Sequence, residues 1–404
     1  MFDFTYTEEQ LALRRLVRDF VQKEVAPVSL ERDKIPDPKE AIPWDIIEKA
    51  NAIGLRTLPL AEKYGGGGAN SQTIAMVIEE LAYGDMGVAV LFHQTWKWVL
   101  LIQELATEDQ IERHLIPWRD DPRGMIALAF TEPVAGSDNL LPCLDVKAGM
   151  KTTAVPDGDH YVLNGMKHFI SNAYCARLYL IFARTDLTKP ITEGASLFLV
   201  PRDTPGLSIG RVDDKVGQRL ADNAEIILEN VRVPKEDLVG EWNKAMASRE
   251  RSVRHSHAFE GATCVGPAQR AFEMALDWAK TRIQGAKPII QHPNIAIRLG
   301  EMWTAIQACR LMYSRVAWSA DNFQYFDTRL FNVVNPFCAE SLMKITLDAM
   351  QIFGGYGMDR SLGIEKLMRD ASTFLHSGGL NEILYMAAGN RLGREPYPRD
   401  WLCI

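Results

Sequence analysis

Apolar residues in the first part of the chain recur at the spacing of amphipathic helices. Between residues 11 and 21 the apolar positions are Leu11, Leu13, Leu16, Val17, Phe20 and Val21. Such spacing gathers them on one side of a helix, with the charged residues of the segment on the other side. Two more apolar segments of this kind cover 73–83 and 88–106. The pattern predicts a helical N-terminal domain over residues 1–118.

A different pattern begins after the polar, proline-containing segment 117–122. Short β-rich runs alternate with turn sequences, among them Asn164-Gly165. The runs cover 125–130, 161–163, 178–183, 196–200 and 224–228. Short strands separated by turns are typical of an antiparallel sheet. We therefore expect a β-barrel-like middle domain over residues 119–236, inserted between two helical domains.

Long amphipathic segments return after about residue 241. They cover 258–282, 293–320, 335–350 and 382–392. Four such segments predict a C-terminal four-helix bundle over residues 237–404. The expected fold class is therefore α+β, with a helical, an antiparallel β and a helical domain in that order.

Composition and charge exclude several kinds of function. The 404 residues carry a formal net charge of −7, which disfavours broad binding to nucleic acid. No apolar run reaches the ~20 residues that a membrane span needs. The N-terminal sequence has the features of neither a signal peptide nor a transit peptide. Six scattered cysteines form no CxxC pair and no metal-ligand spacing, so we expect thiols in a reducing cytoplasm and no metal site.

Glycine clusters occur at two places in the chain. The first, at 65–68, lacks the Lys-Ser/Thr pair of a phosphate-binding P-loop and follows no clear strand, so we interpret it as a loop between helices. The second consists of Gly354, Gly355 and Gly357, shortly after Gln351. Taken alone it indicates a turn, although glycines also let backbone come close to a ligand because they carry no Cβ.

The order of the motifs is more specific than any one of them. The run QIFGGYG at 351–357 is followed by EKLMRD at 365–370. Before them come TEPVAGSD at 131–138, KHFISN at 167–172, and Arg282 followed by GAKPI. In this order they resemble the signatures of the acyl-CoA dehydrogenase family, and the resemblance covers almost the whole chain. It implies an FAD-dependent enzyme that acts on an acyl-CoA thioester, with the same order of three domains.

The resemblance assigns the flavin ring to residues of the middle domain. It implies that Thr131 contacts the pyrimidine edge of the flavin, and that Ser137 lies near the flavin and the path of CoA. Phe169 would pack against the ring where the family usually has tryptophan, and Ser171 would hydrogen-bond flavin N5 in place of threonine. Oriented hydrogen bonds to that edge stabilise the negative charge of a reduced flavin.

The pyrophosphate and adenosine half of FAD is assigned, again by resemblance, to Arg282, Gln351, Gly354 and Gly355. A planar guanidinium suits a pyrophosphate because it offers several donors in one plane. In the family this half is bound by the neighbouring subunit, so the resemblance implies at least a dimer, and more specifically a homotetramer built as a dimer of dimers. Two adenine-side residues of the family are replaced, one by Gly285 and one by Pro293.

The chain departs from the family at the catalytic base. A carboxylate must take the α-proton of the thioester, whose carbonyl is polarised by hydrogen bonds. The family's usual glutamate falls at Gly378, which keeps the backbone N–H of that position and lacks the carboxylate. Some members use an earlier position, which is Ser256 here. Glu260 lies four residues further on, on the same face of a helix, and is our candidate for the base.

Four histidines are weaker alternatives for the base: His93, His255, His257 and His376. A lone histidine is more often a hydrogen-bonded structural residue.

On the substrate side, the resemblance points to Ser137, His257 and Trp96. Four apolar residues lie where the family has the floor of its acyl pocket: Phe92, Trp96, Trp98 and Leu101. Either they fill that pocket, which favours a short, cyclic or polar acyl group, or they serve ordinary packing between helices.

Three hypotheses for the function follow. The first is an FAD-dependent acyl-CoA dehydrogenase that transfers the β-hydride to flavin N5, with electron-transferring flavoprotein as the acceptor expected from the family. The second is a relative with other chemistry on a CoA thioester, such as β-elimination, desulfination, or an oxidase or monooxygenase reaction. The third is a non-catalytic subunit of a mixed tetramer, indicated by Gly378, Gly285 and Pro293. We favour the first because the motifs stand in the family's order.

Overall fold

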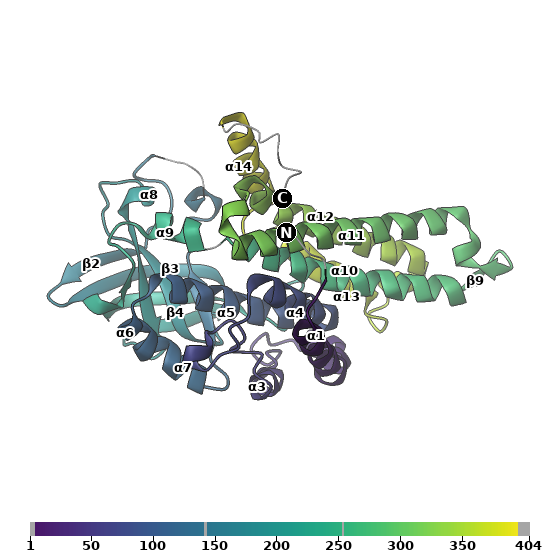
Figure 1. Ribbon diagram of the computed structural model, residues 1–404, viewed down its shortest axis with the longest axis horizontal. Coiled ribbons are helices and arrows are strands. Elements are labelled where there is room, and N and C mark those ends of the chain that lie inside the picture. Colours follow the sequence, from purple (N-terminus) through teal and green to yellow (C-terminus); the bar gives the residue numbers. More distant parts are fainter. Residues whose placement is uncertain (1–4, 141–143, 253, 395–404) are drawn as a thin grey trace.

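The chain folds into a helical part, a β-sheet and a second helical part (Figure 1). The structure is a computed structural model that describes residues 5–140, 144–252 and 254–394. Two of the six cysteines, Cys143 and Cys403, lie outside these residues. Of the others, Cys175, Cys264, Cys309 and Cys338 are buried free thiols. No helix of the described ranges is both long and apolar enough to cross a membrane.

The N-terminal part is helical, as the sequence pattern predicts. Its α-helices are α1 (Glu8–Phe20), α2 (Ala26–Asp33), α3 (Trp44–Ala52), α4 (Ser71–Gly84), α5 (Met86–Leu105), α6 (Glu108–Gln110) and α7 (Ile116–Asp120). Side-chain caps set several of the starts: Thr7 forms a capping box on α1, and Asn70 caps α4. Asp85 has extended backbone between α4 and α5 and accepts from Val88 N–H at 3.1 Å. The glycines at 65–68 form a loop, as expected.

The middle part is an eight-stranded sheet in the order β6-β7-β3-β2-β4-β5-β8, with β1 paired to β4. Its strands are β1 (Met125–Ala129), β2 (Thr153–Asp157), β3 (His160–Ser171), β4 (Ala176–Arg184), β5 (Ala195–Pro201), β6 (Leu207–Val212), β7 (Asn223–Pro234) and β8 (Leu238–Val239). Most neighbours are antiparallel, but β1 is parallel to β4, and β2 touches β4 in parallel at one end. The expectation of a purely antiparallel sheet is therefore wrong at β1. A long connection through β2 and β3 leads from β1 to β4, and only such a connection allows parallel pairing.

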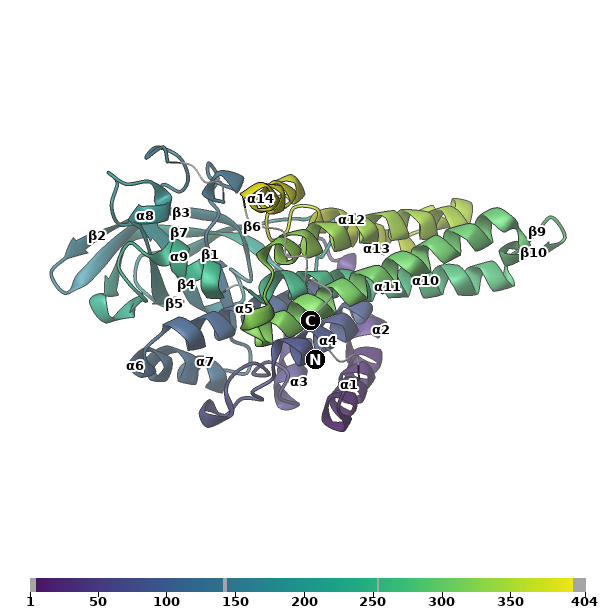
Figure 2. The ribbon, with the colours of Figure 1, turned by 45° about the horizontal axis from the view of Figure 1, so that its top comes forward.

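The C-terminal part contains the four expected helical segments and two shorter helices. They are α9 (Ala245–Ser252), α10 (Ser256–Thr281), α11 (Pro293–Asp321), α12 (Thr328–Phe353), α13 (Ile364–Phe374) and α14 (Asn381–Arg394). Helix α12 starts earlier than the expected residue 335, because Asp327 caps it by accepting from Arg329 N–H at 2.9 Å. The three long helices run side by side away from the sheet (Figures 1 and 2). At their far end, a small hairpin of β9 (Ile283–Gln284) and β10 (Lys287–Pro288) joins α10 to α11.

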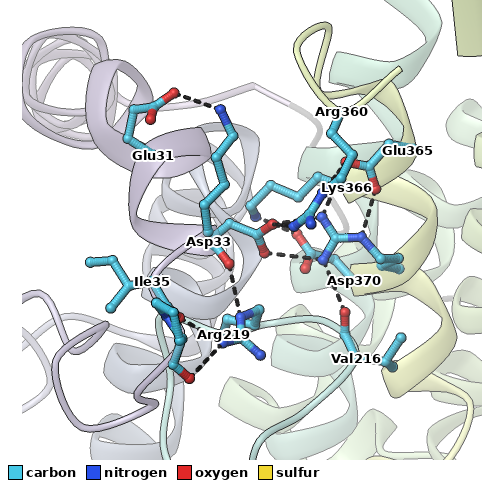
Figure 3. A network of polar contacts seen from close by, with 12 residues as sticks. Glu31, Asp33, Ile35, Val216, Arg219, Arg360, Glu365, Lys366 and Asp370 are labelled. Atoms are coloured by element: carbon cyan, nitrogen blue, oxygen red, sulfur yellow. Dashed lines mark hydrogen bonds and ion pairs between the residues drawn. The ribbon is translucent and has the colours of Figure 1, made fainter. Parts of the chain in front are cut away.

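A buried polar network fastens α13 to the other two parts (Figure 3). Lys366 Nζ donates to the carboxylates of Asp85 (2.9 Å) and Asp370 (2.7 Å). Arg369 donates to Asp33 on α2 (2.6 Å), and Gln218 N–H donates to Asp370 (2.6 Å). The network therefore fixes the segment that follows α13 and the 213–218 loop of the middle part, which both line the cavity described next.

Candidate functional site

A cavity of about 1270 Å³ lies where the three parts of the chain meet. Its walls come from α5, from the segment after β1, from the end of β3, from the connection between β6 and β7 with its two ends, from α9, from the start of α10, and from the end of α13 with the residues after it. We call it the main cavity. It brings together most of the site residues that the sequence predicts: Thr131, Ser137, Phe169, Ser171, His257, Glu260 and Gly378.

One wall of the main cavity has the form of a ring-binding surface. Phe169 is 59% exposed although it is a large apolar residue on a strand, and its φ of +58° is rare for a residue with a side chain. Asn223 Nδ2 holds this backbone by donating to the Phe169 carbonyl (2.9 Å) and reaches the Ser171 hydroxyl at 3.3 Å. An exposed aromatic face beside the hydroxyls of Thr131 and Ser171 fits a flat, polar-edged group such as a flavin.

A buried ion pair joins the two motifs that form this wall. Lys167 Nζ donates to Glu132 Oε1 at 2.9 Å, and both side chains are almost fully buried. Burial lowers the pKa of Lys167 to about 8, although Glu132 opposes the shift. Burial alone would raise the pKa of Glu132, but the Lys167 ammonium and hydrogen bonds from Thr152 and Lys151 hold it below its ordinary value. The pair fixes the Thr131 segment against β3.

A second cavity, of about 620 Å³, lies at the far end of the long helices. Its lining includes Arg282, Gln351, Gly354 and Gly355. A Cβ added at Gly354 or Gly355 would meet no atom within 4 Å, so the backbone there borders open space. This open backbone beside a guanidinium suits the pyrophosphate half of FAD.

The two cavities are far apart within one chain. Glu260 stands near the start of α10, and Arg282 follows its end. At a rise of 1.5 Å per residue, the 22 steps from residue 260 to residue 282 span roughly 33 Å. Figures 1 and 2 show the sheet and the β9–β10 hairpin at opposite ends of the molecule. A single chain therefore does not bring the two predicted groups of FAD ligands together.

Glu260 and Gly378 meet at the end of the main cavity. Glu260 is 2% exposed. Gly378 has a φ of +73°, and a Cβ added there would lie only 2.6 Å from Glu260 Cδ. The segment that carries Gly378 is tethered by Asn335 Nδ2, which donates to the Ser377 carbonyl at 2.9 Å. The carboxylate from α10 thus occupies the space in which a side chain of residue 378 would begin.

The two oxygens of the Glu260 carboxylate differ in their partners. Oε1 accepts from Lys97 Nζ of α5 at 3.0 Å. Oε2 has no hydrogen-bond partner in the described part of the chain. His257 Nε2 lies 3.8 Å from Oε2, which is beyond hydrogen-bond reach. One carboxylate oxygen is therefore buried without a hydrogen-bond partner among the described residues.

The buried histidines around Glu260 are held neutral. Burial lowers the pKa of His257, lowers that of His255 to about 3, and lowers that of His93 well below its ordinary value. Thr263 Oγ1 donates to the Phe259 carbonyl, so it accepts from Nδ1 of His93 (2.7 Å). His257 Nδ1 donates to the Phe331 carbonyl (2.8 Å), which leaves a lone pair on Nε2. Burial therefore makes each of these histidines a weaker base than an ordinary imidazole.

The predicted substrate contact at Trp96 requires a correction. Trp96 is fully buried among the N-terminal helices, and its indole N–H is shared between the carbonyls of Leu55 and Arg56, both at 3.1 Å. Phe92 packs against it at a ring separation of 5.6 Å. Residues two apart on a helix point in different directions, and Trp98 lines the main cavity instead.

Lys97 was missed by the sequence interpretation, although the sequence carries a signal for it. It is the only charged residue between Asp85 and Glu104, in an otherwise apolar helix. A lysine in that setting is rarely buried unless it is paired.

Family models and solved structures match this chain over nearly its whole length. Models of the N-terminal, middle and C-terminal domains of acyl-CoA dehydrogenases match residues 7–119, 127–231 and 250–393. A 3-(aryl)acrylate reductase of Clostridium sporogenes is 32% identical over 389 residues, which are 96% of this chain and 99% of that protein. A cyclohex-1-ene-1-carbonyl-CoA dehydrogenase of Geobacter metallireducens is 33% identical over 96% of this chain and 98% of its own length. The solved structure of butyryl-CoA dehydrogenase from Megasphaera elsdenii superimposes with a TM-score of 0.89, at 30% identity over 97% of this chain and 100% of that chain.

Proposed function

Because the chain belongs to the acyl-CoA dehydrogenase family, we propose that it oxidises an acyl-CoA thioester between Cα and Cβ with Glu260 as the base. The protein is an FAD-dependent oxidoreductase of acyl-CoA thioesters. What is proposed is the residue that takes the proton. The observation that carries the proposal is the position of the Glu260 carboxylate, which fills the space where a side chain of residue 378 would begin.

Each residue around the thioester has a separate part in the reaction. Glu260 Oε2, which has no partner among the described residues, accepts the α-proton. The backbone N–H of Gly378, in the wall of the same cavity, donates to the thioester carbonyl and stabilises the charge that develops on its oxygen. Bound FAD supplies the acceptor for the β-hydride. Ser137 and His257 border the path of the substrate.

FAD binding requires two copies of the chain in this proposal. Thr131, Phe169 and Ser171 hold the flavin ring in the main cavity of one copy. Arg282, Gln351, Gly354 and Gly355 of a second copy hold the pyrophosphate and adenosine. The separation of these groups by roughly 33 Å of helix supports the arrangement. We further propose a homotetramer that passes its electrons to electron-transferring flavoprotein.

An anaerobic reduction assay tests the base. The flavin-loaded protein is mixed with butyryl-CoA or 3-phenylpropionyl-CoA, two thioesters with α-hydrogens suggested by the relatives above, and loss of the oxidised flavin absorbance is followed. Glu260→Gln keeps the size of the side chain and loses the basic oxygen. We expect it to slow reduction by about 10²–10⁴-fold while the flavin content stays that of the wild type.

A matched control is Glu108→Gln, which removes an exposed carboxylate paired with Lys63 and should leave the rate unchanged. Reduction of the Glu260→Gln variant at the wild-type rate would disprove the assignment. If a thioester is consumed while the bound flavin stays oxidised, the reaction is instead an elimination.

A further inference from the structure

We infer that Lys97 is a positioning residue for this reaction, which keeps the Glu260 carboxylate ionised and turned toward the substrate. The inference rests on the proposed role of Glu260 and goes beyond it, because it states what makes a buried glutamate usable as a base.

The geometry of the pair joins two separate parts of the fold. Lys97 lies on α5 of the N-terminal part and Glu260 on α10 of the C-terminal part, with Nζ and Oε1 3.0 Å apart. The side chains are 4% and 3% exposed. The ammonium also lies 5.2 Å from the centre of the Trp98 ring, within the range of a cation–π interaction. The position of Nζ is thus defined from two sides.

Only one of the two Glu260 carboxylate oxygens is paired, and this points to a functional role for the ion pair. A carboxylate that served only to bury a lysine would be expected to have both oxygens satisfied. Here Lys97 satisfies Oε1, while Oε2 is buried without a donor among the described residues, on a residue that lines the main cavity. His257 Nε2 carries a lone pair and cannot donate to Oε2. Lys97 therefore holds the carboxylate by one oxygen and leaves the other for the α-proton.

The charges around Glu260 define what Lys97 contributes. The basic and titratable groups that line the same cavity are His93 and Lys97 of α5, Arg249 of α9, His257 of α10 and His376 after α13. Of these, Lys97 lies 3.0 Å from Glu260 Oε1 and His257 Nε2 lies 3.8 Å from Oε2. The three buried histidines described above are neutral near pH 7. An isolated buried carboxylate takes up a proton rather than stay charged. A protonated Glu260 could not accept the α-proton, so an adjacent ammonium is needed to keep it ionised.

Infrared spectroscopy of the holoenzyme tests this without knowledge of the acyl group. The C=O stretch of a neutral carboxyl group is followed between pH 5 and 9 in the wild type, Lys97→Met and Lys97→Met/Glu260→Gln. We expect Lys97→Met to show a neutral carboxyl at pH 7 that disappears at higher pH and is missing in the double variant. Its titration midpoint should lie at least one pH unit above that of the wild type, a tenfold change in the ionised fraction. Lys97→Arg should resemble the wild type, as should Lys63→Met, which removes an exposed paired lysine.

Spectra of Lys97→Met that match the wild type would overturn the role of Lys97. If Lys97→Met does not fold, the infrared difference spectrum between the wild type and Glu260→Gln gives the test. A neutral Glu260 carboxyl at pH 7 in the wild type overturns the inference, and an ionised one supports it. The failure of the two proposals can be told apart. If Glu260→Gln still reduces its flavin, the base assignment is wrong. If Glu260→Gln loses flavin reduction but the spectra of Lys97→Met match the wild type, only the role of Lys97 is wrong.

Discussion

The carboxylate of Glu260 and the backbone of Gly378 share one space at the end of the main cavity. A Cβ at position 378 would lie 2.6 Å from Glu260 Cδ, much closer than two nonbonded carbons approach. A side chain at residue 378 therefore requires the Glu260 carboxylate to move from its position. The absence of a side chain at residue 378 and the presence of a glutamate at 260 are two aspects of the same arrangement.

The first prediction concerns Gly378→Ala. Its Cβ would push Glu260 away from Lys97 and turn Oε2 out of line with the substrate. Because misplacement of a reacting group by about 1 Å costs on the order of 10²-fold in rate, we expect flavin reduction to slow by that order. The measurement is the anaerobic reduction rate with the thioester that reduces the wild type fastest, together with the ratio of flavin to protein.

Gly158→Ala is the matched control for this variant. Gly158 has a similar backbone, with φ of +59°, in the turn between β2 and β3, and a Cβ there meets no atom within 4 Å. Both variants place a side chain in the left-handed region, which destabilises by about 1–2 kcal/mol. Only Gly378→Ala should lose reduction. Equal rates in the two variants would show that the contact with Glu260 has no effect on the reaction.

The sequence placed Glu260 in the candidate site by counting four residues on from Ser256, the position implied by the family resemblance, and its role as the base stays a prediction. A spacing of four residues from Ser256 places both side chains on one face of one helix, and the structure puts both in the main cavity. Lys97 could not be assigned in this way, because its partner comes from a helix 163 residues away in sequence. Trp96 was misassigned for a related reason: the pattern of α5 is apolar nearly all round, so it does not tell which side faces the cavity and which faces the core.

The fold was predicted best where it depends on nearby residues. Helix starts and strand runs follow from caps and alternation, whereas the parallel pairing of β1 with β4 depends on a connection through β2 and β3. The polar network of α13 likewise depends on residues that are far apart in the sequence. Asp33, Gln218 and Arg369 come from three parts of the chain, and nothing in their local sequence indicates that they meet.

The second prediction addresses that network. Arg369 donates to Asp33 (2.6 Å), to Glu365 (2.6 Å) and to the Val216 carbonyl (3.0 Å). Asp33 is 1% exposed, so Arg369→Met would leave a buried carboxylate without its main partner, a loss on the order of 3–5 kcal/mol. We expect a lower unfolding temperature and partial loss of FAD, because the loop beside Val216 lines the main cavity. Thermal unfolding and the flavin-to-protein ratio measure the two effects.

Arg360→Met serves as the control within the same network (Figure 3). Its side chain is 62% exposed and its guanidinium lies 3.8 Å from Asp33. A long contact from an exposed, solvated guanidinium contributes about 0–1 kcal/mol, so FAD content and unfolding temperature should stay close to those of the wild type. Similar losses in the two variants would contradict the view that burial of Asp33 makes Arg369 important.

The third prediction is a dependence of stability on pH. His93, His255 and His257 are buried in the folded protein, and burial lowers the pKa of each below its ordinary value near 6.5. In the unfolded chain they regain that ordinary value. Below pH 6.5 the unfolded chain therefore binds protons that the folded chain does not, and stability falls with falling pH. The contribution is fully present above pH 6.5 and is lost in the window beneath it, at up to about 1.4 kcal/mol per pH unit for each histidine.

Substitution of one of the three separates this effect from general acid denaturation. His93→Gln can still donate to Thr263 and carries no titrating group. We expect the unfolding temperature of the wild type to drop between pH 7.5 and pH 5.5 at constant ionic strength, and the drop to be smaller in His93→Gln. An equal drop in both proteins would mean that His93 gains its proton while the protein is folded.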